Sequence, residues 1–112
     1  MRINFTFRNL ESSDGIKAYA SEKVAKLQKY LRAPIDAEVT CSMERHNQQV
    51  DVSIVSGGRR YSASEVSDDM YASIDLVMDK IDRQVRDDKG AAVGRKRHAS
   101  AEILAAGGGK SS

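Results

Sequence analysis

The sequence predicts an α+β domain of the order β-α-β-β-β-α, a four-stranded mixed sheet with two helices packed on one face. Four segments alternate apolar and polar residues with a period of two, which is typical of strands with one buried face. Two longer segments repeat apolar residues at spacings of three and four, which is typical of amphipathic helices. The pair Gly57-Gly58 lies between two alternating segments and predicts a tight hairpin, because glycine adopts the positive φ that such turns need.

The first strand and helix are predicted within residues 2–32. Ile3, Phe5 and Phe7 alternate with polar residues, and residues 11–15 have the composition of a turn followed by a helix N-cap. The apolar face of the helix consists of Ile16, Ala20, Val24, Leu27 and Leu31. Pro34 disfavours helical geometry at the residue before it, so this helix is expected to end near residue 31 or 32.

Three strands are predicted next, at residues 37–44, 50–54 and 59–64, with a polar turn at 45–48. Short turns make these strands antiparallel to one another. The first strand reaches the second through a helix, which makes those two parallel if they are neighbours. The sheet face opposite the helices is expected to be solvated and carries Asn4, Thr6, Glu38, Thr40, Asp51 and Ser53.

The second helix is expected to follow Ser67 as its N-cap, with Asp68 and Asp69 in the first turn, where negative charge suits the helix dipole. Its apolar stripe consists of Met70, Ile74, Val77, Met78, Ile81 and Val85. Gly90 is a natural stop, so the helix is expected to end near Asp88. Residues 1–89 are therefore expected to form the folded domain, and residues 90–112 a flexible, basic, glycine-rich tail.

Length and composition narrow the class of protein. The 112 residues suit one domain, and no apolar run approaches the ~18 residues of a membrane span. The alternating stretch directly after Met1 argues against a secretory signal. A single cysteine excludes an intramolecular disulfide framework, so a reducing, cytoplasmic setting is expected.

The sequence contains no pattern of residues that is typical of a catalytic site. Cys41 is in phase with Val39 and Met43, so it is expected to be a core residue rather than a nucleophile. His46 falls in a predicted turn and His98 in the tail, and no His, Cys or carboxylate cluster has metal-ligand spacing. We therefore expect no enzyme activity, no cofactor, no metal and no small-molecule substrate.

Basic residues carry the functional pattern. Residues 1–89 hold 14 basic and 15 acidic side chains, so whole-chain charge says little, but both predicted helices carry basic residues at every third position. These are Lys23, Lys26 and Lys29 on the first helix and Lys80, Arg83 and Arg86 on the second. They could bind phosphates, or they could form solvated pairs within the helix, Asp79 with Arg83 and Asp82 with Arg86.

Two smaller features are open to the same two interpretations. The tail cluster Arg95-Lys96-Arg97 could contact RNA loosely or only aid solubility. Tyr61 and Tyr71 could be core residues with solvated hydroxyls, or could stack on bases.

Residues 56–85 resemble the ribosome hibernation factor family, which includes hibernation promoting factor, protein Y and the proteins called sigma-54 modulation proteins. The family pattern is a glycine hairpin, a short strand, and a helix that begins Asp-Met-Tyr-x-x-Ile-Asp and ends Asp-Lys-Leu-x-Arg-Gln. The matching residues here are Asp69-Met70-Tyr71, Ile74-Asp75 and Asp79-Lys80-Ile81-Asp82-Arg83-Gln84, with Ile81 in place of leucine. Residues 22–30 are similar to the family's first helix, and the resemblance covers residues 1–89.

The resemblance implies a fold similar to a double-stranded-RNA-binding domain with an added first strand. It implies binding to the small ribosomal subunit, through its 16S-type RNA and proteins, in the channel for mRNA and tRNA. Translation would be inhibited by steric occlusion during stress or stationary phase. The ribosomal-RNA contacts that it implies are Lys23, Lys26, Lys29, Lys80, Arg83, Arg86 and Lys89, with Arg95, Lys96 and Arg97 as tail contacts.

Two departures from the family pattern affect these expectations. Asp87 and Asp88 interrupt the basic run that commonly follows the Arg-Gln pair, which would weaken binding there or shift it toward the tail. The 23 residues after Lys89 are too few for the C-terminal dimerisation domain of the long family members, so the chain resembles a short form. The alternative function is a protein-interaction module that modulates a transcription (sigma) factor through the polar sheet face or the acidic second strand.

Overall fold

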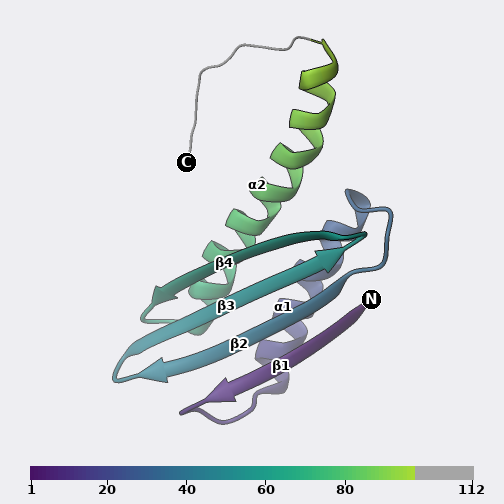
Figure 1. The fold of residues 1–112 in the computed structure, drawn as a ribbon. Helices are drawn as coiled ribbons and strands as arrows, with labels where there is room; N and C mark the ends of the chain where they lie inside the picture. The colour runs from purple at the N-terminus through teal and green to yellow at the C-terminus, as the bar shows by residue number, and fades with distance from the viewer. Residues whose placement is uncertain (98–112) are drawn as a thin grey trace.

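The computed structural model describes the backbone of residues 1–97 and the side chains of residues 1–88. The elements are β1 (Arg2–Arg8), α1 (Asp14–Lys26), the 3-10 turn η1 (Leu27–Lys29), β2 (Asp36–Glu44), β3 (Asn47–Ser56), β4 (Arg59–Ser67) and α2 (Met70–Arg97). The four strands lie in the order β1-β2-β3-β4, with β1 parallel to β2 and the other pairs antiparallel (Figure 1). The predicted α+β fold, with its mixed sheet, is confirmed.

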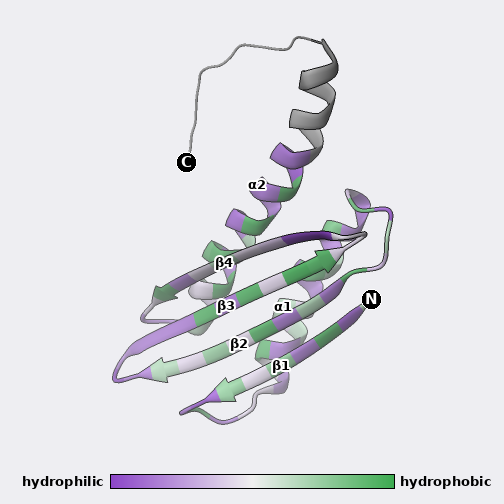
Figure 2. Ribbon diagram, viewed as in Figure 1, coloured by the Kyte–Doolittle hydropathy of each residue, from purple (hydrophilic) through white to green (hydrophobic). Residues whose placement is uncertain are grey.

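Both helices cover the same face of the sheet, behind the strands in the view of Figure 1. The core lies between these two layers, and both predicted helix stripes are buried in it. Its largest fully buried side chains include Leu27, Ile35, Ile54, Ile74 and Ile81. The alternation of hydrophobic and hydrophilic residues along the strands is visible in Figure 2. The period of two in the sequence therefore corresponds to a sheet with one buried and one solvated face.

The solvated face has the residues expected for it. The strand register aligns Thr6, Thr40, Asp51 and Ser64 in one row across all four strands. Hydrogen bonds between side chains satisfy part of this face, including Asn4 to Glu38 at 2.9 Å and Arg60 to Ser53 at 3.0 Å. No element of the described part of the chain covers it.

The two hairpins differ in how their turns are made. Gly57 and Gly58 have φ angles of 57° and 80°, which are the positive values of the predicted two-residue turn. The other turn places Arg45 at a φ of 61°, a conformation that a side-chain-bearing residue adopts at some cost. Strands β3 and β4 are longer than the sequence predicted, because ladder pairing continues outward to Asn47 and Ser67, beyond the alternating apolar residues.

The first helix begins as expected and ends earlier. Ser13 is the N-cap, and its hydroxyl accepts a hydrogen bond from Ile16 N–H at 3.2 Å. The α-helix stops at Lys26 and tightens into a 3-10 turn, so the expected end near residue 31 is wrong. The Gln28 amide donates to the carbonyls of Leu31 (2.7 Å) and Ala33 (2.9 Å), which satisfies backbone acceptors outside the helix and fixes the irregular segment before β2.

Both predicted ends of the second helix need correction. Ser67 is the last residue of β4, and the carboxylate of Asp69 makes the cap by accepting from Ala72 N–H at 3.2 Å. Neither Asp68 nor Asp69 lies in the first turn, since α2 begins at Met70.

At the other end, α2 passes the predicted stop and continues to Arg97. Gly90 costs about 1 kcal/mol relative to alanine in a helix, which does not by itself stop a helix that continues into Ala91 and Ala92. Residues 90–97 of the expected flexible tail are therefore helical, and residues 98–112 lie outside the described residues. The division of the chain at residue 89 stays a prediction.

Met70→Asp is expected to unfold the domain. Met70 is 3% exposed, and the substitution would bury an unpaired carboxylate, with a loss of more than about 3 kcal/mol in the free energy of unfolding. Leu76→Asp on the same helix is the control, because Leu76 is 46% exposed. Urea unfolding followed by circular dichroism measures both. A Met70→Asp protein as stable as the Leu76→Asp protein would contradict the position of α2 in the core.

Candidate nucleic-acid interface

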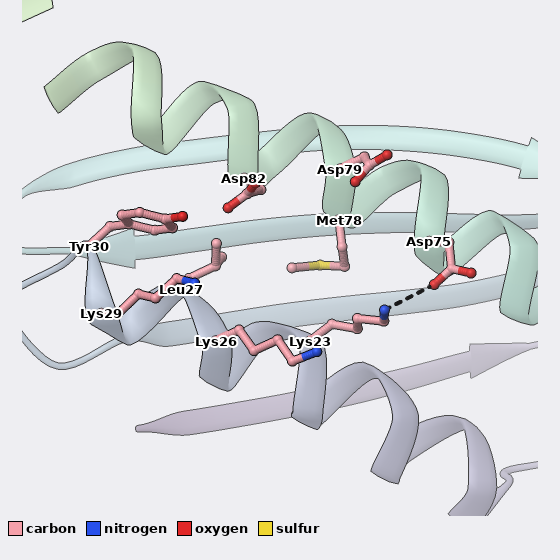
Figure 3. Close-up of a pocket in the computed structure, with 9 residues that line it drawn as sticks. All are labelled: Lys23, Lys26, Leu27, Lys29, Tyr30, Asp75, Met78, Asp79 and Asp82. Atoms are coloured by element: carbon pink, nitrogen blue, oxygen red, sulfur yellow. Dashed lines mark ion pairs between the residues drawn. The ribbon is translucent and has the colours of Figure 1, made fainter. Parts of the chain in front are cut away.

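A row of lysines follows the solvent side of the first helix. Lys23 and Lys26 are in the last turn of α1, and Lys29 is in η1. Val24 and Leu27 are buried between them, so the local helical geometry turns the lysines away from the core. Lys26 and Lys29 are exposed and Lys23 is half-buried. All three line a groove between α1 and α2 (Figure 3), so the structure brings the first predicted basic row together.

The opposite wall of this groove is acidic. Its residues on α2 are Asp75, Asp79 and Asp82, while Leu27, Met78 and Tyr30 complete the lining (Figure 3). The groove has a volume of about 270 Å³. This acidic wall was not among the features predicted from the sequence. Its signal was available, because the three aspartates are spaced by four and three residues, next to the apolar stripe of the same helix.

Contacts among Tyr19 and Lys23 of α1 and Tyr71 and Asp75 of α2, here called the clasp, join the two helices at one end of the groove. The Tyr19 hydroxyl donates to Asp75 Oδ1 at 2.6 Å, and Lys23 Nζ lies 3.5 Å from the same oxygen. Lys23 also lies over the Tyr19 ring, 5.2 Å from its centroid. Tyr19 and Asp75 both raise the pKa of Lys23, and the hydrogen bond to Asp75 raises the pKa of Tyr19. Lys23 is therefore a charged residue that already has a carboxylate partner.

The aromatic part of the clasp requires a glycine. The rings of Tyr19 and Tyr71 pack edge to face at 5.1 Å between centroids. A Cβ at Gly15 would lie only 2.8 Å from the Tyr71 hydroxyl oxygen, so α1 approaches this ring because residue 15 has no side chain. Tyr71 is 40% exposed and Tyr61 is buried, with its hydroxyl donating to Asp88 at 2.7 Å. Both tyrosines therefore have packing roles within the fold.

The basic row of the second helix is spread around the helix. Lys80 forms an ion pair with Glu65 of β4, on the side away from the groove. Arg86 pairs with Asp82 at 3.0 Å, which confirms one of the two predicted pairs within the helix. Arg83 is exposed and forms no ion pair with residues 1–88, so the predicted Asp79–Arg83 pair is absent. The predicted cations therefore differ in whether a carboxylate already neutralises them.

The remaining predicted cations lie at the end of α2. The side chain of Lys89 is outside the described residues. Arg95, Lys96 and Arg97 form the last residues of the helix, and only their backbone is described. Their assignment as RNA contacts stays a prediction.

The described residues contain no candidate catalytic or metal-binding site. Cys41 is fully buried, and its burial raises the pKa of the thiol to about 11, so it is a core residue as expected. His46 is exposed in the β2–β3 turn, while His98 lies outside the described residues. Residues 1–88 contain no group of three or more His, Cys, Asp or Glu side chains that could hold a metal ion. Neither helix in this part of the chain combines the length and apolar content needed to cross a membrane.

Comparison with known proteins agrees with this arrangement. Residues 3–92 match the family described as sigma 54 modulation protein / S30EA ribosomal protein, and the chain belongs to this family. The ribosome hibernation promoting factor of Escherichia coli K12 is 31% identical over 85 residues, which are 76% of this chain and 90% of that protein. The corresponding factor of Azotobacter vinelandii is 29% identical over 85 residues, or 76% of this chain and 79% of that protein.

A solved structure gives the same fold. The N-terminal domain of Thermus thermophilus protein Y superposes with a TM-score of 0.72 at 28% identity, covering 78% of this chain and 98% of that domain. The matched segment covers only 48% of the hibernation promotion factor of Lactococcus lactis, so the chain matches the shorter relatives over most of their length and the longer ones over half. The resemblance to the hibernation factor family is confirmed, and this family is non-enzymatic.

The clasp between the helices can be tested by a double-mutant cycle. Tyr19→Phe removes one hydrogen bond, and Asp75→Ala removes its acceptor together with the carboxylate partner of Lys23. Each is expected to lower the urea midpoint, Asp75→Ala by more, and the double variant should match Asp75→Ala alone because the hydrogen bond that Tyr19→Phe removes is already lost in Asp75→Ala. Additive shifts would contradict the coupling. Asp87→Ala on the same helix is the control for removal of an exposed carboxylate.

Proposed function

We propose that this protein binds the small ribosomal subunit in the channel for mRNA and tRNA and inhibits translation by steric occlusion during stress or stationary phase. Membership of the S30EA family supports this proposal, as do relatives named ribosome hibernation promoting factors. The structural observation that carries the proposal is the set of exposed cations that both helices present.

The ion pairs divide these cations into two groups. Lys26, Lys29 and Arg83 have no carboxylate partner among residues 1–88, so RNA phosphates can bind them without displacing another charge. Lys29 instead lies over the Tyr30 ring, 5.1 Å from its centroid. We assign these three residues as the main phosphate contacts.

In the second group, each cation must give up a carboxylate partner before it can bind a phosphate. Lys23, Lys80 and Arg86 are each paired with a carboxylate. A phosphate that approaches them competes with that carboxylate, so the net gain per contact is smaller. Lys89, Arg95, Lys96 and Arg97 are further proposed contacts, assigned from the sequence alone.

The proposed mechanism needs no chemical step. The helices are packed on the sheet through a continuous core, so the domain is preorganised as a solid body that can fill a channel. Binding through phosphates would weaken steeply with salt, because each contact releases counterions from the RNA. Occupation of the channel would then exclude mRNA and tRNA by volume alone.

The alternative, modulation of a sigma factor, would use a different surface. The polar sheet face is open and carries carboxylates such as Glu38 and Asp51. The affinity for a protein partner on this face would not change with substitutions on the helices. The two proposals are therefore separated by which face of the domain tolerates charge reversal.

Charge reversal at Lys26→Glu together with Arg83→Glu is expected to weaken binding to purified small subunits by roughly 100-fold or more, because two phosphate contacts become repulsive. Co-sedimentation across a salt series measures this, with an unrelated folded RNA as competitor. Wild-type binding should survive the competitor and fall with salt, and translation in vitro should be inhibited in parallel. The matched control is Arg8→Glu with Arg60→Glu, two exposed residues on the strands with the same change in net charge.

Three results would overturn parts of the proposal. Equal binding by the helix variant and the wild type would refute the site assignment. Loss of binding only in the strand variant would favour the sheet face as the binding surface. A wild-type protein that fails to sediment with small subunits at low salt would remove the ribosome proposal and leave the protein-partner alternative.

A further inference from the structure

An acidic wall is unexpected in a groove proposed to face RNA. Asp79 is exposed, lines the groove, and forms no hydrogen bond or ion pair with residues 1–88. The neighbouring aspartates differ from it, since Asp75 is held by Tyr19 and Lys23, and Asp82 by Arg86. Asp79 is therefore an acceptor without a partner in this part of the chain, on the wall opposite the lysines (Figure 3).

Phosphate alone does not match this groove. A phosphate placed between the walls would gain attraction from Lys26 and lose part of it to repulsion from Asp79, which no cation among residues 1–88 neutralises. A groove that serves only backbone phosphates gains nothing from a carboxylate wall. The occupant that satisfies both walls has a negative group on one side and hydrogen-bond donors on the other.

A single nucleotide has that distribution of groups. Its phosphate is negative, its base has a flat apolar face, and the amino group of cytosine, adenine or guanine donates hydrogen bonds to carboxylates. The groove supplies the matching features: lysines on one wall, Leu27 and Met78 between the walls with Tyr30 at one end, and the carboxylate of Asp79 on the other wall (Figure 3). Unstacked bases in single-stranded RNA are the ones that proteins read in this way.

We propose that the groove between α1 and α2 binds one unpaired, amino-bearing nucleobase of the RNA, with Asp79 accepting from its amino group and Lys26 contacting its phosphate. This inference rests on the proposed function and gives it a point of base recognition. Asp79 is then a specificity-determining residue, and the lysines supply affinity. The groove, with a volume of about 270 Å³, has room for one base.

The proposal can be tested by asking whether removal of the Asp79 carboxylate weakens or strengthens binding to small subunits. Asp79→Ala and Asp87→Ala each remove one exposed carboxylate from α2, but only Asp79 lines the groove. If RNA binding depends on charge alone, both variants should bind small subunits more tightly, because a repulsive charge is lost. If Asp79 accepts a hydrogen bond from a base, Asp79→Ala should weaken binding about tenfold while Asp87→Ala does not.

Chemical probing identifies the base directly. Dimethyl sulfate and kethoxal modify the pairing edges of unpaired bases in the small-subunit RNA. A base protected by the wild type and by Asp87→Ala, and reactive again with a saturating amount of Asp79→Ala, is the expected result. Thermal unfolding of both variants checks that the fold is retained, as expected for exposed positions.

The outcomes separate this inference from the proposed function. Wild-type binding with Asp79→Ala equal to or tighter than Asp87→Ala, and with unchanged protections, overturns the base site alone. A wild type that fails to bind small subunits overturns the proposed function and the base site with it. Weaker binding by Asp79→Ala together with loss of one protection supports both.

Discussion

Burial of the apolar stripe of α2 against β3 and β4 is the constraint on which the rest of the structure depends. Val77, Ile81 and Val85 are fully buried. Polar contacts fix the helix along its length: Ser73 donates to Gln48 O at 2.6 Å, Gln84 donates to Ser62 O at 2.8 Å, and Tyr61 and Arg59 donate to Asp88 at 2.7 and 2.9 Å. These contacts fix the rotation of the helix about its own axis. They therefore also fix the direction in which every other side chain of α2 points.

That rotation distributes the charges of α2 among three environments. The aspartates at 75, 79 and 82 face α1, Lys80 faces β4, and Arg83 faces solvent. A basic row that looks uniform in the sequence is therefore divided by its surroundings, because a spacing of three residues moves each successive side chain around the helix. The net charge available to a polyanion is smaller than the count of basic residues suggests.

The relation between the helices completes the surface. The clasp of Tyr19 with Asp75, and the close approach of Tyr71 to Gly15, hold α1 beside α2 at one end of the groove. Because α1 is fixed at this end, its lysines face the aspartates of α2 across the groove. The lysines therefore do not form one continuous positive surface with the cations of α2. The groove therefore combines positive charge, an apolar lining and hydrogen-bond acceptors, and the proposed base recognition rests on this combination.

The sequence by itself determined the fold class, the glycine hairpin and nearly the whole core, because burial leaves a periodic pattern that each element carries alone. It also determined which residues are basic and lie off the apolar stripes. The helix ends, the cap at Asp69, the pair between Lys80 and Glu65, and the acidic wall of the groove were decided only by the tertiary structure. Their physical reason is shared: each depends on how one element is rotated and placed against another, which no local periodicity specifies.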